Sequence, residues 1–257
     1  MNSIMKKYVW LTFVLFFGTQ QLLADDHLKQ IAQIAQKAYS EGQYRYAIEL
    51  YDSIISKGYA SAALYYNIGN AHFKSEQMAY AIWYYEKAKK LAPGDEQIIH
   101  NLNLANTLIT DNIEKIPMLF YERWWVNLYS MTTADNWGKI AIVLAFLMVS
   151  FFAAYLLSRV IRYKKIFFLM SFAALALFIL SLTCAHKQYH NTYVKETAVV
   201  FAPRVTAKSA PDVGSIDLFV IHEGTKVWVK EILGDWYEIR LANGNVGWIN
   251  KNSVRKI

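Results

Sequence analysis

Two long runs of apolar residues interrupt an otherwise mixed pattern of hydrophobic and polar positions along the chain. They cover residues 140–157 and 166–185 and contain only a few Ser, Thr and Tyr residues. As α-helices they would be about 27–30 Å long, which matches the hydrocarbon core of a bilayer. The pattern therefore predicts two transmembrane helices, over residues 137–158 and 166–186.

A shorter apolar run near the N-terminus predicts a secretory signal peptide over residues 1–24. It has ten residues, too few to span a bilayer, and it follows Lys6 and Lys7. We expect cleavage after the small residue Ala24. The large side chain of Leu22 in the cleavage motif leaves an uncleaved anchor as the alternative.

Basic residues beside these runs predict the orientation of the membrane helices. The loop between the two spans, residues 159–165, carries four bases. They are Arg159, Arg162, Lys164 and Lys165. A short loop rich in Lys and Arg stays in the cytoplasm. Residues 25–136 and 187–257 then lie together on the extracytoplasmic side.

The segment ahead of the first span, residues 111–136, is rich in aromatic residues. Its sequence FYERWWVNLYS gathers five aromatic side chains around Glu122 and Arg123. Aromatic side chains favour the headgroup level of a membrane. We expect an interfacial segment here, and a packed linker is the alternative.

Residues 27–110 contain a repeat with a period of 34 residues. QYRYAIELY at 43–51 aligns with QMAYAIWYY at 77–85, with five identical positions. This period, with small and aromatic residues at fixed sites, is the signature of tetratricopeptide (TPR) repeats, each of which is a pair of helices. The sequence therefore predicts an all-α TPR domain over residues 25–110. Its helices are expected near 27–40, 43–57, 61–74 and 77–91, with a capping helix near 95–110.

The second repeat fits the TPR signature best. Gly69 and Ala81 allow its two helices to approach, Tyr85 fills the gap beside them, and His72 replaces the usual aromatic residue. Solenoids of this kind bind peptides or partner helices on their concave face. In the second repeat we expect this face to present Tyr66, Asn70, Phe73 and Lys74. The alternative is that these side chains are ordinary solvated or intramolecular residues.

The last part of the chain, residues 187–257, changes to about five short strands separated by Gly and Pro, a pattern typical of a small barrel. Asn243-Gly244 predicts a β-hairpin, because both central residues of the favoured two-residue turn need positive φ. Alternation within WYEIRL places three residues on one face, which we expect in the core. They are Tyr237, Ile239 and Leu241.

Residues 197–257 resemble a bacterial SH3 domain. GDWYEIRLANGNVGWINKNSV matches the strand, distal hairpin, strand and short helical turn of that family. The resemblance implies an all-β barrel. The chain departs from peptide-binding members at Asn250, where a proline is usual, and at Val254, where a groove tyrosine is missing, so Pro-rich ligands are not expected. Trp236 and Trp248 are the candidate ligand face for a peptide or cell-wall glycan-peptide, unless they only cover the barrel.

The sequence contains no motif for catalysis or for a cofactor. His186 and His190 are one helical turn apart, but Lys187 stands where a metalloprotease needs Glu. Neither a Gly-rich phosphate loop nor GxSxG is present. The single cysteine, Cys184, lies in an apolar run, which excludes an intrachain disulfide and a CxxC motif. We expect no enzymatic activity, no cofactor and no bound metal.

The distribution of basic residues indicates the class of partner. The chain of 257 residues has a net charge of +7, but its bases cluster beside the apolar runs and in the C-terminal part. No stripe of Lys and Arg is present, so the composition argues against nucleic acid as a partner and in favour of a membrane.

The order of these parts is more distinctive than any one of them. Signal peptide, two TPR units, aromatic linker, membrane hairpin and SH3-like barrel, together with ERWWVNLYSMTTADNWGKIAIVLAFL, resemble the BatE-type proteins of bacterial aerotolerance operons. The resemblance spans nearly the whole chain. It implies a bacterial inner-membrane protein with both outer domains in the periplasm, encoded beside a MoxR-type ATPase and von Willebrand A-domain proteins, with a role in oxygen or stress tolerance.

These features predict a non-enzymatic membrane scaffold that recruits envelope proteins through its TPR and SH3-like domains. The alternative is a cell-wall sensor, in which the SH3-like domain holds peptidoglycan and the TPR domain is a spacer. A transport component is disfavoured, because neither span carries an ionisable residue in its middle.

Overall fold

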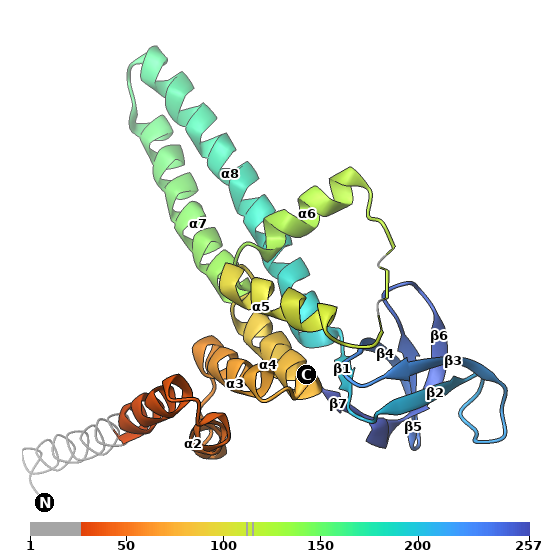
Figure 1. The fold of residues 1–257 in the computed structure, drawn as a ribbon. Coiled ribbons are helices and arrows are strands. Elements are labelled where there is room, and N and C mark those ends of the chain that lie inside the picture. Colours follow the sequence, from red (N-terminus) through yellow and green to blue (C-terminus); the bar gives the residue numbers. More distant parts are fainter. Residues whose placement is uncertain (1–26, 112, 115) are drawn as a thin grey trace, which may run out of the picture.

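The computed structural model describes residues 27–111, 113–114 and 116–257. The signal peptide predicted over residues 1–24 therefore lies outside the described residues. The chain forms a helical domain, a hairpin of two long apolar helices, and a β domain built on a seven-stranded antiparallel sheet (Figure 1). This confirms the expected combination of an all-α part with an all-β part.

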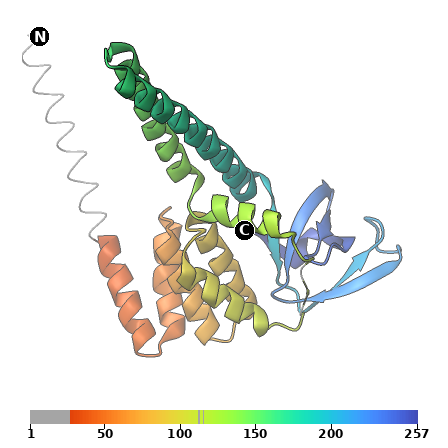
Figure 2. The ribbon, with the colours of Figure 1, turned by 90° about the horizontal axis from the view of Figure 1, so that it is seen from above.

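The helical domain is a row of helices, and from α2 to α5 each helix packs against the next. Residues 27–40 form the first helix, followed by α2 (Tyr44–Ser56), α3 (Ala62–Lys74), α4 (Met78–Leu91) and α5 (Glu96–Thr107). Figure 2 shows them side by side in sequence order. Ser61 and Asp95 start α3 and α5, because their side-chain oxygens accept hydrogen bonds from N–H groups of the first turn. The helices match the expected ranges, except that α5 ends before residue 110.

Small residues let α3 and α4 approach each other. A Cβ added at Gly69 would lie 2.6 Å from two ring carbons of Tyr85. Tyr85 is almost fully buried, and Ala81 and Ala88 on the same helix are fully buried. The contact therefore leaves no room for a Cβ at position 69, where the repeat predicted a small residue.

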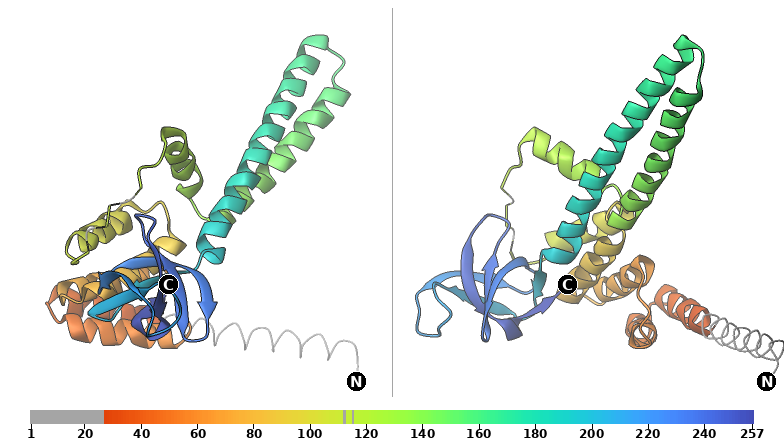
Figure 3. Two further views of the ribbon diagram at one scale, coloured as in Figure 1. Left: turned by 90° about the vertical axis from the view of Figure 1, so that its right-hand side faces the viewer. Right: turned by 180° about the vertical axis from the view of Figure 1, so that it is seen from behind.

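The hairpin consists of α7 (Ala134–Leu157) and α8 (Ile161–Tyr189), and it projects away from both domains (Figures 1 and 3). Both helices are long and apolar enough to cross a membrane, and only 6% and 17% of their most apolar windows are buried. Large apolar side chains face outward, such as Phe146, which is 73% exposed. A core helix of a soluble domain would bury such side chains.

Small and polar residues join α7 to α8. Ser181 Oγ donates a hydrogen bond to the carbonyl oxygen of Trp137 at 2.8 Å, and Ser171 Oγ donates to that of Met148 at 3.2 Å. Cys184 is fully buried. Small residues of this kind allow close contact between apolar helices, and hydroxyl groups add hydrogen bonds across the contact.

The connection between these helices is shorter than the loop predicted over residues 159–165. Helix α8 begins at Ile161, so three of the four bases belong to its first turns, and residues 158–160 form the connection. The basic cluster still lies at the tip of the hairpin, at the end opposite to the two domains (Figure 1).

Helix α6 (Phe120–Ser130) forms the middle of the predicted aromatic linker and packs beside the domain end of α8. Phe120 and Trp124 are exposed, whereas Tyr129 is buried and its hydroxyl accepts a hydrogen bond from Asn191 Nδ2 at 2.8 Å. The helix thus has an exposed aromatic face and an edge fixed to the chain that follows α8.

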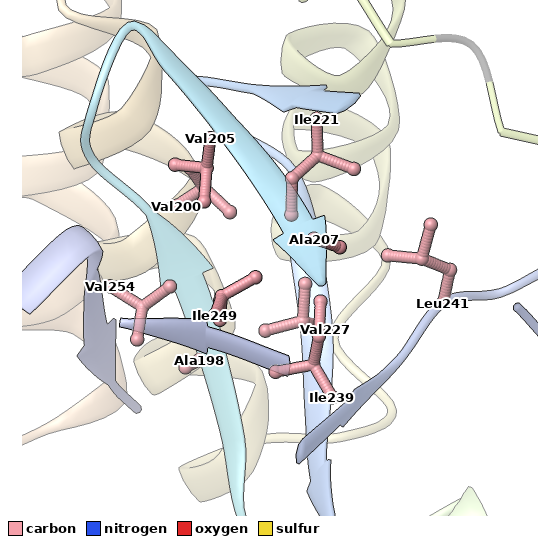
Figure 4. Packing of buried hydrophobic residues seen from close by; sticks show 10 residues of the cluster. All are labelled: Ala198, Val200, Val205, Ala207, Ile221, Val227, Ile239, Leu241, Ile249 and Val254. Atoms are coloured by element: carbon pink, nitrogen blue, oxygen red, sulfur yellow. The ribbon is translucent and has the colours of Figure 1, made fainter. Parts of the chain in front are cut away.

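The β domain has the strand order β3-β2-β6-β5-β4-β1-β7. The strands are β1 (Thr197–Val200), β2 (Arg204–Lys208), β3 (Asp217–His222), β4 (Lys226–Leu233), β5 (Trp236–Arg240), β6 (Val246–Asn250) and β7 (Val254–Lys256). Their buried apolar side chains converge on one core (Figure 4). Ile239 and Leu241 belong to it as predicted, and Tyr237 packs at its edge.

Three features of the β domain differ from the sequence prediction. Strand β2, between two prolines, and strand β7, with three residues, were not anticipated. Burial alternates along β2, but its two inward residues are Val205 and the small Ala207, which give a weak apolar pattern, and β7 is too short to show one. In the β5–β6 hairpin, Gly244 has a φ of +92°, but Asn243 does not have a positive φ. The N–H of Leu241 donates to the carbonyl oxygen of Asn245 at 2.9 Å, so the loop has three residues, 242–244, and needs one left-handed residue only.

Replacing Gly69 with valine is expected to lower the free energy of unfolding by about 1–3 kcal/mol, the usual cost of overpacking a tight contact. The added side chain collides with the ring of Tyr85. Ala63→Val, at an exposed position of the same helix, is the control and should cost less than about 1 kcal/mol. Unfolding of the full chain in detergent, followed by circular dichroism, measures both changes. Equal losses in the two variants would contradict the tight α3–α4 contact.

Candidate binding surfaces

Helix α3 carries the residues predicted for the concave face, and two of them have partners inside the domain. Asn70 Oδ1 accepts hydrogen bonds from the Tyr85 hydroxyl at 2.7 Å and from Asn101 Nδ2 at 2.9 Å. The same amide of Asn101 donates to the hydroxyl oxygen of Tyr66 at 3.0 Å. Helix α5 thereby uses polar groups that a partner would otherwise contact.

The other two predicted residues differ in exposure. Phe73 is half-buried against the apolar cluster that contains Tyr85, whereas Lys74 is exposed at the end of α3. The face predicted from the second repeat is therefore only partly open to a partner.

The same face continues on α5 through residues that were not singled out from the sequence. Leu104 and Leu108 lie 34 residues after Asn70 and Lys74, and they are 43% and 55% exposed. Applying the 34-residue period to the capping helix could have found them. They extend the open part of the face as an apolar edge.

Tyr39 extends the face in the other direction, onto the first helix. It lies 34 residues before Phe73, and its ring is 5.4 Å from that of Tyr44, measured between centroids. Burial raises the pKa of its hydroxyl, and the nearby hydroxyls of Tyr44 and Tyr66 raise it further. The concave side therefore continues onto the first helix through aromatic side chains.

His72, at the position where the repeat usually has an aromatic residue, is buried. Its ring stacks on those of Tyr80 and Tyr84, with centroid distances of 4.9 and 5.4 Å, and its Nδ1 is 2.6 Å from Gln77 Oε1. Burial lowers its pKa, and the hydrogen bond with Gln77 and the charge of Asp52 oppose this only in part. His72 thus serves as an aromatic core residue.

Trp236 on β5 and Trp248 on β6 lie on the same outer face of the β domain. The register places Trp248 opposite Glu238, which shares a side of β5 with Trp236. Both tryptophans are half-exposed. Lys208, opposite Trp248 on β2, forms an ion pair with Asp217 at 2.5 Å. The face combines flat apolar surfaces with charged groups.

The β domain packs directly on the helical domain. Val199 of β1 is fully buried in one apolar cluster with Ile82 of α4 and residues of α5. The ring of Phe201 meets Tyr80 edge-on with centroids 4.8 Å apart, and the guanidinium of Arg255 lies 4.4 Å from the Phe201 centroid. The two domains therefore share a continuous apolar core.

Polar contacts surround this shared core. Trp83 Nε1 donates to the carbonyl oxygen of Lys256 at 2.8 Å. Lys226 Nζ lies 2.6 Å from Glu86 Oε2, and the Glu86 side chain is only 10% exposed. These contacts join α4 to β7 and β4.

Asp111, in the linker after α5, binds the turn between β3 and β4. Its Oδ2 accepts hydrogen bonds from the Thr225 hydroxyl and the His222 N–H, both at 2.6 Å, and its Oδ1 lies 2.7 Å from His222 Nδ1. Burial alone would raise the pKa of Asp111, but the hydrogen bonds from Thr225 and His222 outweigh it and hold this pKa below its ordinary value. A lone acid in a linker gives no sequence signal for such a role.

His186 lies in the last turn of α8, and His190 begins the π-helix that follows, His190–Val194. Among the residues that the structure describes, no group of three or more His, Cys, Asp or Glu side chains could hold a metal ion. A scan against protein-family models and a search of curated proteins both give no match. The function is therefore inferred from the surfaces described above.

Replacing Asp111 with alanine is expected to lower the free energy of unfolding by about 2–3 kcal/mol at neutral pH, because hydrogen bonds to a largely buried carboxylate are lost. The pKa of Asp111 is lower in the folded chain than its ordinary value of 3.8. Its contribution is therefore present above that value and disappears as the pH falls through the folded pKa. The difference in free energy of unfolding between wild type and variant should become smaller at strongly acidic pH.

Thermal unfolding of the full chain from neutral to strongly acidic pH, followed by circular dichroism, measures this difference in stability. Asp212→Ala is the control, because Asp212 is an exposed acid in the β domain. A loss of stability that is the same for both variants, or that does not change with pH, would contradict the role assigned to Asp111.

Proposed function

We propose that the protein is a non-enzymatic scaffold of the bacterial inner membrane whose folded domains recruit partner proteins on the periplasmic side. One observation carries the proposal. Both domains lie at one end of the apolar hairpin, and the basic tip lies at the other (Figure 3). In this proposal α7 and α8 span the membrane, the helical domain is a TPR unit and the β domain is an SH3-like barrel.

Membrane insertion is supported by three features of the structure. The outward faces of α7 and α8 are apolar, and lipid removes such surface from water. Helix α6 exposes Phe120 and Trp124 beside the domain end of the hairpin, where aromatic side chains favour the headgroup level. The basic tip at residues 159–165 suits the cytoplasmic side.

Recruitment of a partner is proposed for the open part of the concave face. Lys74, Leu104 and Leu108 are its exposed residues. An amphipathic helix with apolar residues for the two leucines and an acid for Lys74 fits this surface. The resemblance to BatE-type proteins makes von Willebrand A-domain proteins the partner class to test first, in an aerotolerance-linked or stress-linked complex with a MoxR-type ATPase.

The alternative function is a cell-wall sensor. It is favoured by the position of Trp236 and Trp248 on one face, beside Glu238 and the Lys208–Asp217 ion pair. Aromatic rings next to polar groups suit a glycan-peptide, which has both apolar sugar faces and charges. In this alternative the helical domain only holds the β domain at a distance from other partners.

Single cysteines test the topology, in a Cys184→Ser background. Lys57→Cys in the helical domain and Asn243→Cys in the β domain should react with a membrane-impermeant maleimide in intact spheroplasts. Val160→Cys, at the exposed tip of the hairpin, should react only after permeabilisation. Labelling of position 160 in intact spheroplasts, with positions 57 and 243 protected, would refute the arrangement.

Photo-crosslinking in native membranes tests recruitment. A photo-reactive residue at Leu104 or Leu108 of the full-length protein should give discrete adducts with envelope proteins, because these side chains form the open edge of the face. The control site is Tyr59, an exposed residue in the loop after α2. Equal adducts from all three sites, or none from the two leucines, would contradict the scaffold. Binding of the full chain to purified sacculi that is lost in Trp236→Ala would favour the cell-wall sensor instead.

A further inference from the structure

A cavity of about 620 Å³ lies between the π-helix that follows α8 and strands β4 and β5. Its walls come from the π-helix, from the two residues that follow it, from the two strands, and from the two residues that follow β5. The residues that matter here are His190, Val194, Lys195, Trp228, Lys230 and Arg240. The cavity is distinct from the concave face of the helices. It adjoins the face that carries Trp236 and Trp248, because Arg240 shares a side of β5 with Trp236 and lies opposite Trp228.

The walls of this cavity carry an excess of positive charge. Three Lys and Arg residues line it, and none forms an ion pair with any residue that the structure describes. They are Lys195, Lys230 and Arg240. Of the two acids on the wall, Glu196 is paired with Lys256 at 2.6 Å, which leaves Glu231 against the three bases.

The charged form of Lys195 is disfavoured in this cluster of basic residues. Partial burial lowers its pKa, and the ammonium groups of Lys187 and Lys230 lower it further. An anion held among these groups would favour the charged form of Lys195. The cavity is therefore complementary in charge to an anionic group.

The cavity lies where α8 would leave the membrane. The apolar run of α8 ends at residue 185, and the π-helix begins five residues later. Asn191 in that π-helix is hydrogen-bonded to Tyr129 of α6, and Tyr189 and Tyr193 beside it are exposed. Tyrosines of this kind are enriched at the headgroup level of membranes.

We propose that this cavity binds the phosphate-bearing headgroup of an anionic membrane lipid, and the proposal rests on the membrane insertion of α7 and α8. The guanidinium of Arg240 can bind two phosphate oxygens, and Lys195 and Lys230 supply point charges. Trp228 and Val194 provide apolar wall for the glycerol part of the lipid.

A lipid fits this cavity better than free phosphate does. The volume of about 620 Å³ is in the range of pockets that enclose whole small molecules, far more than one phosphate fills. Basic pockets beside membrane helices recognise anionic headgroups by the same combination of charge and position. The headgroup would also fix the β domain against the membrane surface.

Titration of the purified full chain in detergent tests the proposal. Phosphatidylglycerol, phosphatidylcholine and inorganic phosphate are added separately, and binding is followed by the shift in unfolding temperature and by native mass spectrometry. We expect saturable binding of phosphatidylglycerol and much weaker binding of the zwitterionic lipid. Lys195→Gln/Lys230→Gln should weaken phosphatidylglycerol binding about tenfold or more, because each base near an anionic lipid contributes about 1 kcal/mol.

Two further variants distinguish loss of positive charge from loss of folding as the cause of weaker binding. Lys195→Arg/Lys230→Arg keeps both charges and should keep binding. Lys37→Gln/Lys57→Gln removes two exposed lysines of the helical domain and should bind like wild type. Equal affinities of the Lys195→Gln/Lys230→Gln variant and this control would overturn the proposal, and so would binding of inorganic phosphate with no preference for phosphatidylglycerol.

Carbonate extraction of membranes separates this proposal from the one on which it rests. If the protein stays in the carbonate-washed membrane but binds phosphatidylglycerol no better than phosphatidylcholine, only the lipid site is overturned. A protein that carbonate releases overturns membrane insertion, and the lipid site with it.

Discussion

The packing of β1 against α4 is the contact on which the rest of the structure depends. Val199 and Ile82 belong to one buried cluster, although a hairpin of two long helices separates them in the sequence. Because α7 and α8 run side by side, the chain leaves and re-enters the folded part at neighbouring points, and the return to α4 needs no long connection. Burial of this shared apolar surface is the main favourable term, since it removes side chains of both domains from water.

Polar contacts at the edge of this core select one orientation of the domains. The Glu86–Lys226 pair is largely buried, so its attraction is offset by the cost of removing two charges from water. A different orientation would leave one of these charges, or the carboxylate of Asp111, without its partners. An unpaired buried charge costs far more than the pair contributes, so wrong arrangements are penalised. The concave face, the tryptophan face and the basic cavity are thereby held in set positions relative to the hairpin.

Local periodicity explains which parts of this architecture were predictable. The apolar runs and the position of Gly69 opposite Tyr85 follow from spacings within a single sequence. Asn243-Gly244 marked a turn correctly, but the dipeptide does not determine whether two or three residues form the loop. Asp111 contacts a residue 111 positions away, and no local pattern encodes such a pairing.

The concave face shows a conflict between folding and binding. A short row of helices has few neighbouring helices to satisfy its buried polar groups, and here Asn101 of α5 binds both Tyr66 and Asn70. What remains for a partner is one charge and an apolar edge, at Lys74, Leu104 and Leu108. Such a surface gives modest affinity by itself. Joining it in one body with a second face and, in the proposed arrangement, a membrane anchor raises the effective concentration for any partner that touches two of them, which increases affinity without new contacts.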